Sequence, residues 1–129
     1  MGKGFTVTFQ GDHIRLDSVA ERSIAYARAL WTEVAEMCKK HDCYFVLGAS
    51  NAPGPMPTMD GYEHAELFRE LEISGKYRIA FAELNDDAIE ATRFVETVMA
   101  NRGLPGRAFS TEEEARQWLF SDSDPASVL

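Results

Sequence analysis

The sequence has few of the features that place a short chain in a special structural class. Its 129 residues include only two cysteines, which is too few for a disulfide framework, and no run of eighteen apolar residues that could cross a membrane. The opening segment MGKGFTVTFQ lacks the apolar stretch of a signal peptide. We therefore expect a cytoplasmic protein without a transmembrane segment, folded as a single domain because a chain of this length buries roughly two-thirds of its unfolded surface.

Basic residues are also scarce, and this bears on the partner. The 13 lysines and arginines are outnumbered by 21 acidic residues, giving a formal charge of −8. Binding to a phosphate backbone depends on basic side chains that neutralise phosphates, so nucleic acid is excluded as the expected partner. The glycine-rich motifs that cradle nucleotide phosphates, G-x-x-x-x-G-K-[ST] and G-x-G-x-x-G, are absent as well.

Two cysteines and a histidine, which are candidate zinc ligands, occur close together in residues 38–43. Cys38, His41 and Cys43 lie within six residues, but no second Cys/His pair follows elsewhere in the chain. Zinc normally takes four protein ligands, or three and a water molecule. We therefore predict free, reduced thiols, no metal and no cofactor.

The first third of the chain changes from a period of two to a period of 3.6. Residues 5–9 and 13–19 alternate apolar and polar side chains around Gly11-Asp12, which predicts an antiparallel hairpin, with His13 as a solvated turn residue. Apolar residues from Ala20 to Lys40 then recur at helical spacing. This spacing predicts a long amphipathic helix, with Trp31 on its buried side.

Buried strands and capped helices are predicted to alternate after that helix. The apolar run CYFVLGA (43–49) predicts a strand covered on both faces, and a capping box at Asp60 and Glu63 predicts a helix to about Leu71. YRIAFAEL (77–84) predicts a second buried strand.

The remaining elements are predicted from their end signals. Residues 85–103 open with Asn-Asp-Asp and close with Arg-Gly, which is typical of a helix. The segment RAF (107–109) predicts a short edge strand, and Ser110 with Glu113 predicts the cap of a last helix whose inner side includes Trp118.

These elements predict an α/β fold in one domain. The order β-β-α-β-α-β-α-β-α is satisfied by a single mixed five-stranded sheet with an N-terminal antiparallel hairpin and about four flanking helices, over residues 1–120. Residues 121–129 predict a frayed acidic tail.

Three segments carry a resemblance to a known family: YRIAFAE, RFVETVMANRG and RAFSTEEEARQWL. In these the chain resembles the SpoIIAA-like branch of the STAS superfamily, named for sulphate transporters and anti-sigma-factor antagonists. The element order is similar over nearly the whole chain. The resemblance implies a STAS-like fold and a regulatory, non-enzymatic binding module.

The same resemblance raises the question of a phosphorylation switch. In the anti-sigma-factor antagonists the phosphorylated serine follows a central strand within a D-x-S type motif. Here the matching segment is Leu47-Gly48-Ala49-Ser50, which has no Asp before its serine. We therefore expect no switch at Ser50 and predict that Ser50→Asp leaves partner binding nearly unchanged.

The leading candidate site is the Gly/Pro-rich segment 48–60, which follows the third predicted strand. Ligands of open α/β sheets bind beyond the carboxyl ends of parallel strands, and methionines offer an adaptable apolar contact. The site residues predicted here are Ser50, Met56, Thr58, Met59 and, on the next helix, His64. The expected partner is a protein or a small apolar ligand, and the alternative is that the segment is a stiff connector.

An enzyme is the alternative from a different class. His64 lies one helical turn from Asp60 and close in sequence to Glu63 and Glu66, so a small hydrolase or transferase using His64 with these carboxylates is conceivable. No nucleophile is identifiable by spacing, and we predict no catalytic residue. A homodimer is expected, in which exposed strand edges and the apolar Phe94 and Val98 are covered by a second copy.

Overall fold

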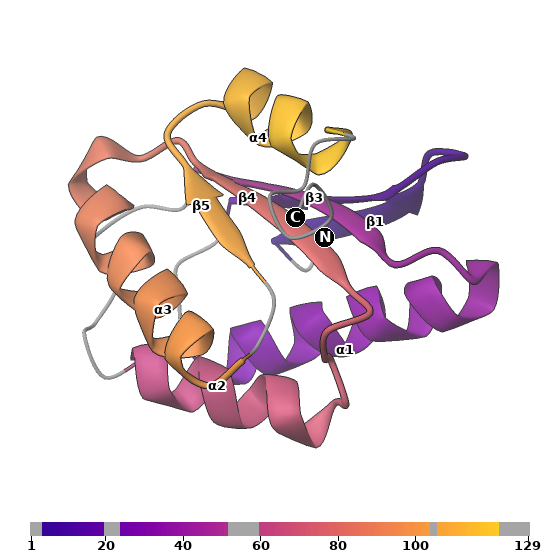
Figure 1. The fold of residues 1–129 in the computed structure, drawn as a ribbon, viewed down its shortest axis with the longest axis horizontal. Coiled ribbons are helices and arrows are strands. Elements are labelled where there is room, and N and C mark those ends of the chain that lie inside the picture. Colours follow the sequence, from indigo (N-terminus) through magenta and orange to yellow (C-terminus); the bar gives the residue numbers. More distant parts are fainter. Residues whose placement is uncertain (1–3, 20–23, 52–59, 104–105, 122–129) are drawn as a thin grey trace, which may run out of the picture.

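The computed structural model describes residues 4–19, 24–51, 60–103 and 106–121, and within these it confirms the predicted α/β class with one mixed five-stranded sheet and four α-helices (Figure 1). The elements are β1 (Phe5–Phe9), β2 (Ile14–Ser18), α1 (Ile24–His41), β3 (Phe45–Ser50), α2 (Asp60–Glu70), β4 (Arg78–Glu83), a 3-10 turn (Asp86–Ala88), α3 (Ile89–Asn101), β5 (Arg107–Phe109) and α4 (Glu112–Leu119). No helix in the described parts of the chain is long and apolar enough to cross a bilayer. Residues 122–129, predicted as a frayed tail, lie outside the description.

The strands lie in the sheet in the order in which they occur in the chain. β1 pairs antiparallel with β2, and β2 to β5 pair in parallel, each parallel pair being joined through a helix. Right-handed connections between successive parallel strands that always step in one direction place every crossover helix on the same face. Figure 1 shows this arrangement, with α1, α2 and α3 on one side of the sheet and α4 on the other.

The face beneath α1, α2 and α3 carries the larger core. The Trp31 ring of α1 meets Phe68 of α2 edge to face, with ring centroids 4.9 Å apart, and Val34 and Cys38 are fully buried. This confirms Trp31 as a packing residue. Both cysteines are free thiols, as predicted, and burial raises the pKa of Cys38 to about 12.

Helix α4 covers the opposite face of the sheet, and two arginine side chains of the sheet bind it. Arg15 of β2 donates to both carboxylate oxygens of Glu112 at 2.8 and 3.0 Å, and also to Asp17. Arg78 of β4 lies over the Trp118 ring, 3.8 Å from its centroid, and donates to the Trp118 carbonyl oxygen at 2.7 Å. Paired guanidinium groups of this kind set the position of a helix that is only eight residues long.

Two predictions about helix and turn residues were wrong. The cap of α4 is Thr111, whose Oγ1 accepts from the Glu114 N–H at 3.2 Å, whereas the prediction was Ser110 with Glu113. His13, predicted to be solvated, is only 4% exposed because its ring packs edge to face against Phe120, just beyond α4. The burial of His13 depends on a long-range contact that no local pattern reports, whereas the cap differs from the prediction by one residue.

Candidate functional site

The inner face of the sheet is arranged in rows that cross β2, β3 and β4. Residues two apart on a strand share a face, and the observed register aligns the three strands. From the amino to the carboxyl ends of the strands, the rows are Ile14/Val46/Ile79, Leu16/Gly48/Phe81 and Ser18/Ser50/Glu83. The sheet therefore changes from apolar to polar at its carboxyl end, where open α/β folds bind ligands.

Gly48 makes room for an aromatic ring in the middle row. A Cβ atom placed on Gly48 would lie 2.8 Å from Cδ1 of Phe81 and 3.5 Å from Leu16. Real Cβ atoms do not approach other atoms that closely, so the Phe81 ring lies in the space that a side chain at position 48 would fill. Gly48 belongs both to the predicted strand 43–49 and to the candidate segment 48–60, and the structure places it within β3.

A cavity of about 100 Å³ lies between this face and the three helices. Its walls are mainly apolar, and several polar side chains line it. The apolar lining includes Leu30, Trp31, Phe68, Phe81, Val95 and Met99, and the polar lining includes Ser18, Tyr26, Ser50, His64, Thr92 and Glu96. A single water needs about 10–15 Å³ by such a measure, so the space suits a small organic molecule.

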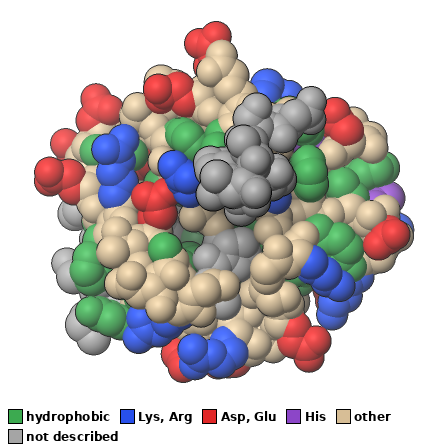
Figure 2. All heavy atoms as spheres, in the orientation of Figure 1, with side chains coloured by type: hydrophobic (Ala, Val, Ile, Leu, Met, Phe, Trp, Pro, Cys, Tyr) green, Lys and Arg blue, Asp and Glu red, His purple; other side chains and the backbone are tan. Residues whose placement is uncertain are grey.

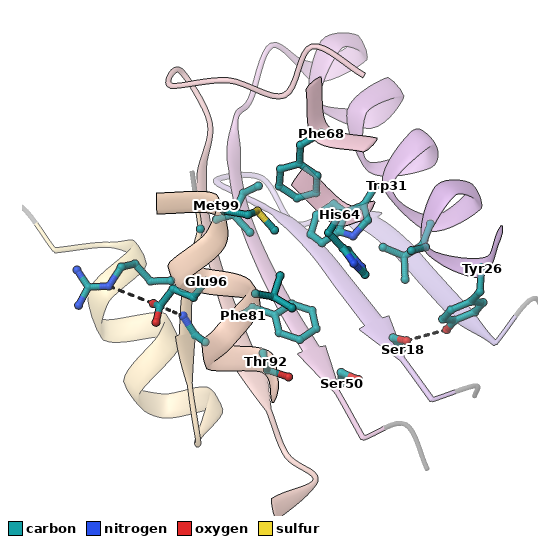
Figure 3. Close-up of a pocket in the computed structure, with 17 residues that line it drawn as sticks. Ser18, Tyr26, Trp31, Ser50, His64, Phe68, Phe81, Thr92, Glu96 and Met99 are labelled. Atoms are coloured by element: carbon teal, nitrogen blue, oxygen red, sulfur yellow. Dashed lines mark hydrogen bonds and ion pairs between the residues drawn. The ribbon is translucent and has the colours of Figure 1, made fainter. Parts of the chain in front are cut away.

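The polar side chains are gathered at one end. Figure 3 shows Ser18, Ser50 and Thr92 along the lower end of the cavity and Phe68 and Met99 at the upper end, with His64 projecting between them. Ser18 and Ser50 are 5% and 1% exposed, so their hydroxyl groups belong to the interior.

The Ser18 hydroxyl belongs to a short hydrogen-bonded chain. Ser18 Oγ lies 2.7 Å from the Tyr26 hydroxyl of α1, and that hydroxyl donates to the Gly4 carbonyl oxygen at 2.6 Å. The Tyr26 hydroxyl group has a single proton, and this proton points to the Gly4 carbonyl oxygen. The Ser18 hydroxyl group must therefore be the donor in its hydrogen bond with Tyr26. This chain connects the start of β1, the end of β2 and helix α1.

A buried carboxylate lies beside this polar end. Glu83, the last residue of β4, is 1% exposed. Its Oε1 accepts from the Thr92 hydroxyl of α3 at 2.9 Å, and its Oε2 accepts from the Asn85 N–H at 3.2 Å. These bonds compensate for much of the cost of removing a carboxylate from water. They also connect α3 to the end of the sheet.

At its outer rim the cavity is lined by α3 and β5. Glu96 accepts from the Ala108 N–H at 2.8 Å, and its Oε2 lies 3.5 Å from Arg107 Nε (Figure 3). The carboxylate thus satisfies a donor of edge strand β5, and the Arg107 charge is already paired. Among the described residues, no three His, Cys, Asp or Glu side chains come together as a metal site would require.

The structure brings together two of the five predicted site residues. Ser50 and His64 line the same cavity, although Ser50 is the buried last residue of β3 and not a loop residue as predicted. Met56, Thr58 and Met59 lie outside the described residues. Ser18, Tyr26 and Thr92, which also line the cavity, were not predicted as site residues from the sequence. A polar residue ending each of β2, β3 and β4 was the one available signal, and it acquires meaning only when the register is known.

Comparisons with known proteins do not add a family. No protein-family model, no curated protein and no solved structure matches this chain. The STAS resemblance therefore stays a prediction, and function has to be argued from the cavity itself.

Proposed function

We propose that this protein is a non-catalytic, STAS-like regulatory domain of the cytoplasm that binds a small apolar ligand. The observation that supports the proposal is the cavity beneath α1, α2 and α3, with apolar and aromatic walls and hydroxyl groups gathered at one end. Concave, mostly apolar sites with a few convergent polar groups are typical of small-molecule binding. The two free thiols suit a reducing compartment.

The site differs from the one expected from sequence in where the ligand would lie. The ligand would be enclosed between sheet and helices, where the aromatic rings of Trp31, Phe68 and Phe81 would contact it, and would not lie on the surface of the segment 48–60. Nucleic acid remains a poor partner. On the face shown in Figure 2, Lys and Arg side chains lie among Asp and Glu and do not gather into a basic patch.

Native mass spectrometry of the protein purified from its own cells tests the proposal. We expect a bound small molecule that is released on denaturation. Ala27 of α1 lines the cavity and is 6% exposed, so Ala27→Phe should fill the space and remove the bound mass. The matched control is Ala29→Phe at an exposed position of the same helix, which should retain it. A ligand-free wild-type protein, or a bound mass that survives Ala27→Phe in a folded variant, would contradict the proposal.

A hydrolase or transferase that uses His64 is the second candidate, because His64 lines the cavity together with four hydroxyl groups. Against it, both oxygens of the buried Glu83 accept hydrogen bonds from Thr92 and Asn85, and the Ser18 proton is donated to Tyr26. These groups stabilise the fold and are not arranged as a base and its nucleophile. The test is hydrolysis of 4-nitrophenyl acetate. Turnover that disappears in His64→Gln would favour the enzyme, and a background rate in both proteins would favour the binding domain.

A further inference from the structure

The directions of the hydroxyl protons at the polar end of the cavity restrict which ligands can bind there. This inference rests on the proposed function, the binding of a small molecule in the cavity. Two hydroxyl groups that line the cavity have partners that determine where their protons point. Ser18 donates to Tyr26, since the only Tyr26 proton goes to the Gly4 carbonyl oxygen, which can only accept. Thr92 donates to Glu83 Oε1.

A hydroxyl group whose only proton is already engaged in a hydrogen bond can offer a further partner only its lone pairs, which accept hydrogen bonds. Ser18 and Thr92 therefore present acceptors to the cavity. They lie on either side of Ser50 (Figure 3). Ser18 is the neighbour of Ser50 on β2, and Glu83, which accepts from Thr92, is its neighbour on β4. A ligand whose polar group could only accept would meet lone pairs at both positions.

The charges around the polar end also disfavour a negatively charged ligand. The acidic Glu83 lies directly behind Thr92, and Arg107, the cationic side chain at the rim, is paired with Glu96. A carboxylate ligand at the polar end would approach Glu83, and among the described lysine and arginine side chains that line the cavity none offers it an unpaired charge. A buried acceptor or charge that loses its water and finds no partner weakens binding, so these contacts can discriminate between ligands.

We infer that the cavity takes an uncharged molecule with a small apolar or aromatic body and a hydrogen-bond donor, O–H or N–H, at one end. Acceptor-only compounds of the same size, such as aldehydes, and carboxylates would meet only lone pairs at Ser18 and Thr92 and are disfavoured at these two positions. The aromatic side chains Trp31, Phe68 and Phe81 in the walls suit a flat ring. The donor would lie against Ser18 or Thr92.

The test is a set of matched probes titrated into the full-length protein and followed by amide chemical shifts. Phenol supplies a donor, benzaldehyde only an acceptor, and fluorobenzene neither strong group, on nearly the same ring. We expect phenol to bind about tenfold more tightly than the other two, which corresponds to one hydrogen bond. Equal binding of phenol and benzaldehyde, or tighter binding of benzaldehyde, would overturn the inference.

Two variants assign the effect to the Ser18 chain. Tyr26→Phe removes the acceptor of the Ser18 proton and frees that proton to point into the cavity, so benzaldehyde should gain affinity relative to phenol. Ser18→Ala should reduce phenol binding and leave fluorobenzene binding unchanged. If both variants keep the same preference for phenol, the hydroxyl groups of Ser18 and Tyr26 do not cause it, and its assignment to the Ser18 chain is overturned.

Failure of this inference can be told apart from failure of the proposed function. If no probe binds to the wild type, or all bind equally well to Ala27→Phe, the cavity is not a ligand site and the proposed function fails. If the probes bind to the wild type, are lost in Ala27→Phe and show no preference for the donor, only the inference about ligand chemistry fails.

Discussion

The Phe81 ring of β4 lies over Gly48 of β3, so close that a Cβ atom at position 48 would come within 2.8 Å of the ring. The two residues are direct partners in the parallel register. Phe81 also lines the cavity, so the missing side chain at position 48 determines how far the ring projects into it.

Gly48→Ala should therefore push the Phe81 ring toward the cavity. We expect a loss of about 1–3 kcal/mol in the free energy of unfolding, the usual cost of overpacking, and weaker binding of phenol. Urea unfolding and the chemical-shift titration measure these effects. Gly75→Ala, at a position with nothing within 4 Å, is the control and should be close to neutral. In the Phe81→Leu background the cost of Gly48→Ala should shrink, and an unchanged cost would show that the ring is not the cause.

Burial of Ser50 changes what an acidic substitution there should do. Ser50 is 1% exposed and pairs across the sheet with Glu83, so Ser50→Asp would place a second carboxylate in the interior beside the first. We now expect a loss of several kcal/mol in stability, on the order of 3. The sequence alone predicts nearly unchanged partner binding. Thermal unfolding measures the difference, with Ser50→Ala as the control. A melting temperature equal to that of the wild type would argue that Ser50 is open to modification.

The Arg15–Glu112 pair predicts a pH-dependent contribution to stability. Arg15 lowers the pKa of Glu112 below its ordinary value of 4.5. A carboxyl group with a lowered pKa in the folded state stabilises the protein above its unfolded pKa, and this contribution disappears as the pH falls through the folded pKa. Because Glu112 remains 36% exposed, Arg15→Gln should cost only about 1 kcal/mol at neutral pH.

Urea unfolding at pH 7 and at pH 3 checks this prediction, since the difference between wild type and Arg15→Gln should narrow at the lower pH. Arg28→Gln removes an exposed pair with Glu70, in which both side chains are more than half exposed, and serves as the matched control. We expect little change from it at either pH. A difference for Arg15→Gln that is constant with pH would mean that Arg15 acts through packing alone.

The two thiols should differ strongly in reactivity. Burial raises the pKa of Cys38 to about 12, and the side chain is fully enclosed, whereas Cys43 is half-buried. Because the thiolate is the reactive form, we expect a disulfide reagent such as DTNB to titrate one thiol quickly in the native protein and two after denaturation. Cys43→Ser should remove the fast phase. A fast phase that persists in Cys43→Ser would show that the region around Cys38 opens readily.

His13 should be replaceable with a gain in stability. Its Nδ1 lies 2.7 Å from Asp12 Oδ1, but its Nε2 is buried without a partner among the described residues. His13→Phe keeps an aromatic ring against Phe120 and removes the unpaired nitrogen, which should raise the free energy of unfolding by about 1 kcal/mol. His41→Phe, which keeps a ring stacked on Phe9, is the control and should be nearly neutral. A destabilised His13→Phe would point to an unseen partner for Nε2.

The structure removes part of the basis for the predicted homodimer. Val98, expected to be covered by a second copy, is buried within the chain, and the Phe94 ring already packs edge to face against Tyr62. The expectation of a homodimer now depends on the exposed strand edges.

Most of the fold was predictable because its signals are local. Alternation over residues 5–9 and 14–18, the apolar runs of β3 and β4, and the polar caps of the helices act within a few residues of where they occur. The sequential strand order was not among these predictions, because right-handed connections are compatible with several orders and only the structure selects one. The strand ends were predicted to within two residues, and the cap of α4 was displaced by one. The helix predicted from Ala20 is described from Ile24, and the helix predicted over 85–103 opens as a 3-10 turn before α3 begins at Ile89.

The site was decided by contacts between residues far apart in the chain. Ser18, Ser50 and Glu83 form one row only because β2, β3 and β4 pair in a register that no single strand encodes, and Thr92 bonds Glu83 only because α3 returns to the end of β4. The cavity is likewise the space left by the packing of side chains from three helices over Phe81 and Gly48. The sequence by itself determined which residues are apolar, polar or helix-terminating. Only the tertiary structure decided which hydroxyl groups donate their hydrogen bonds to other protein groups, because that depends on partners brought together by folding.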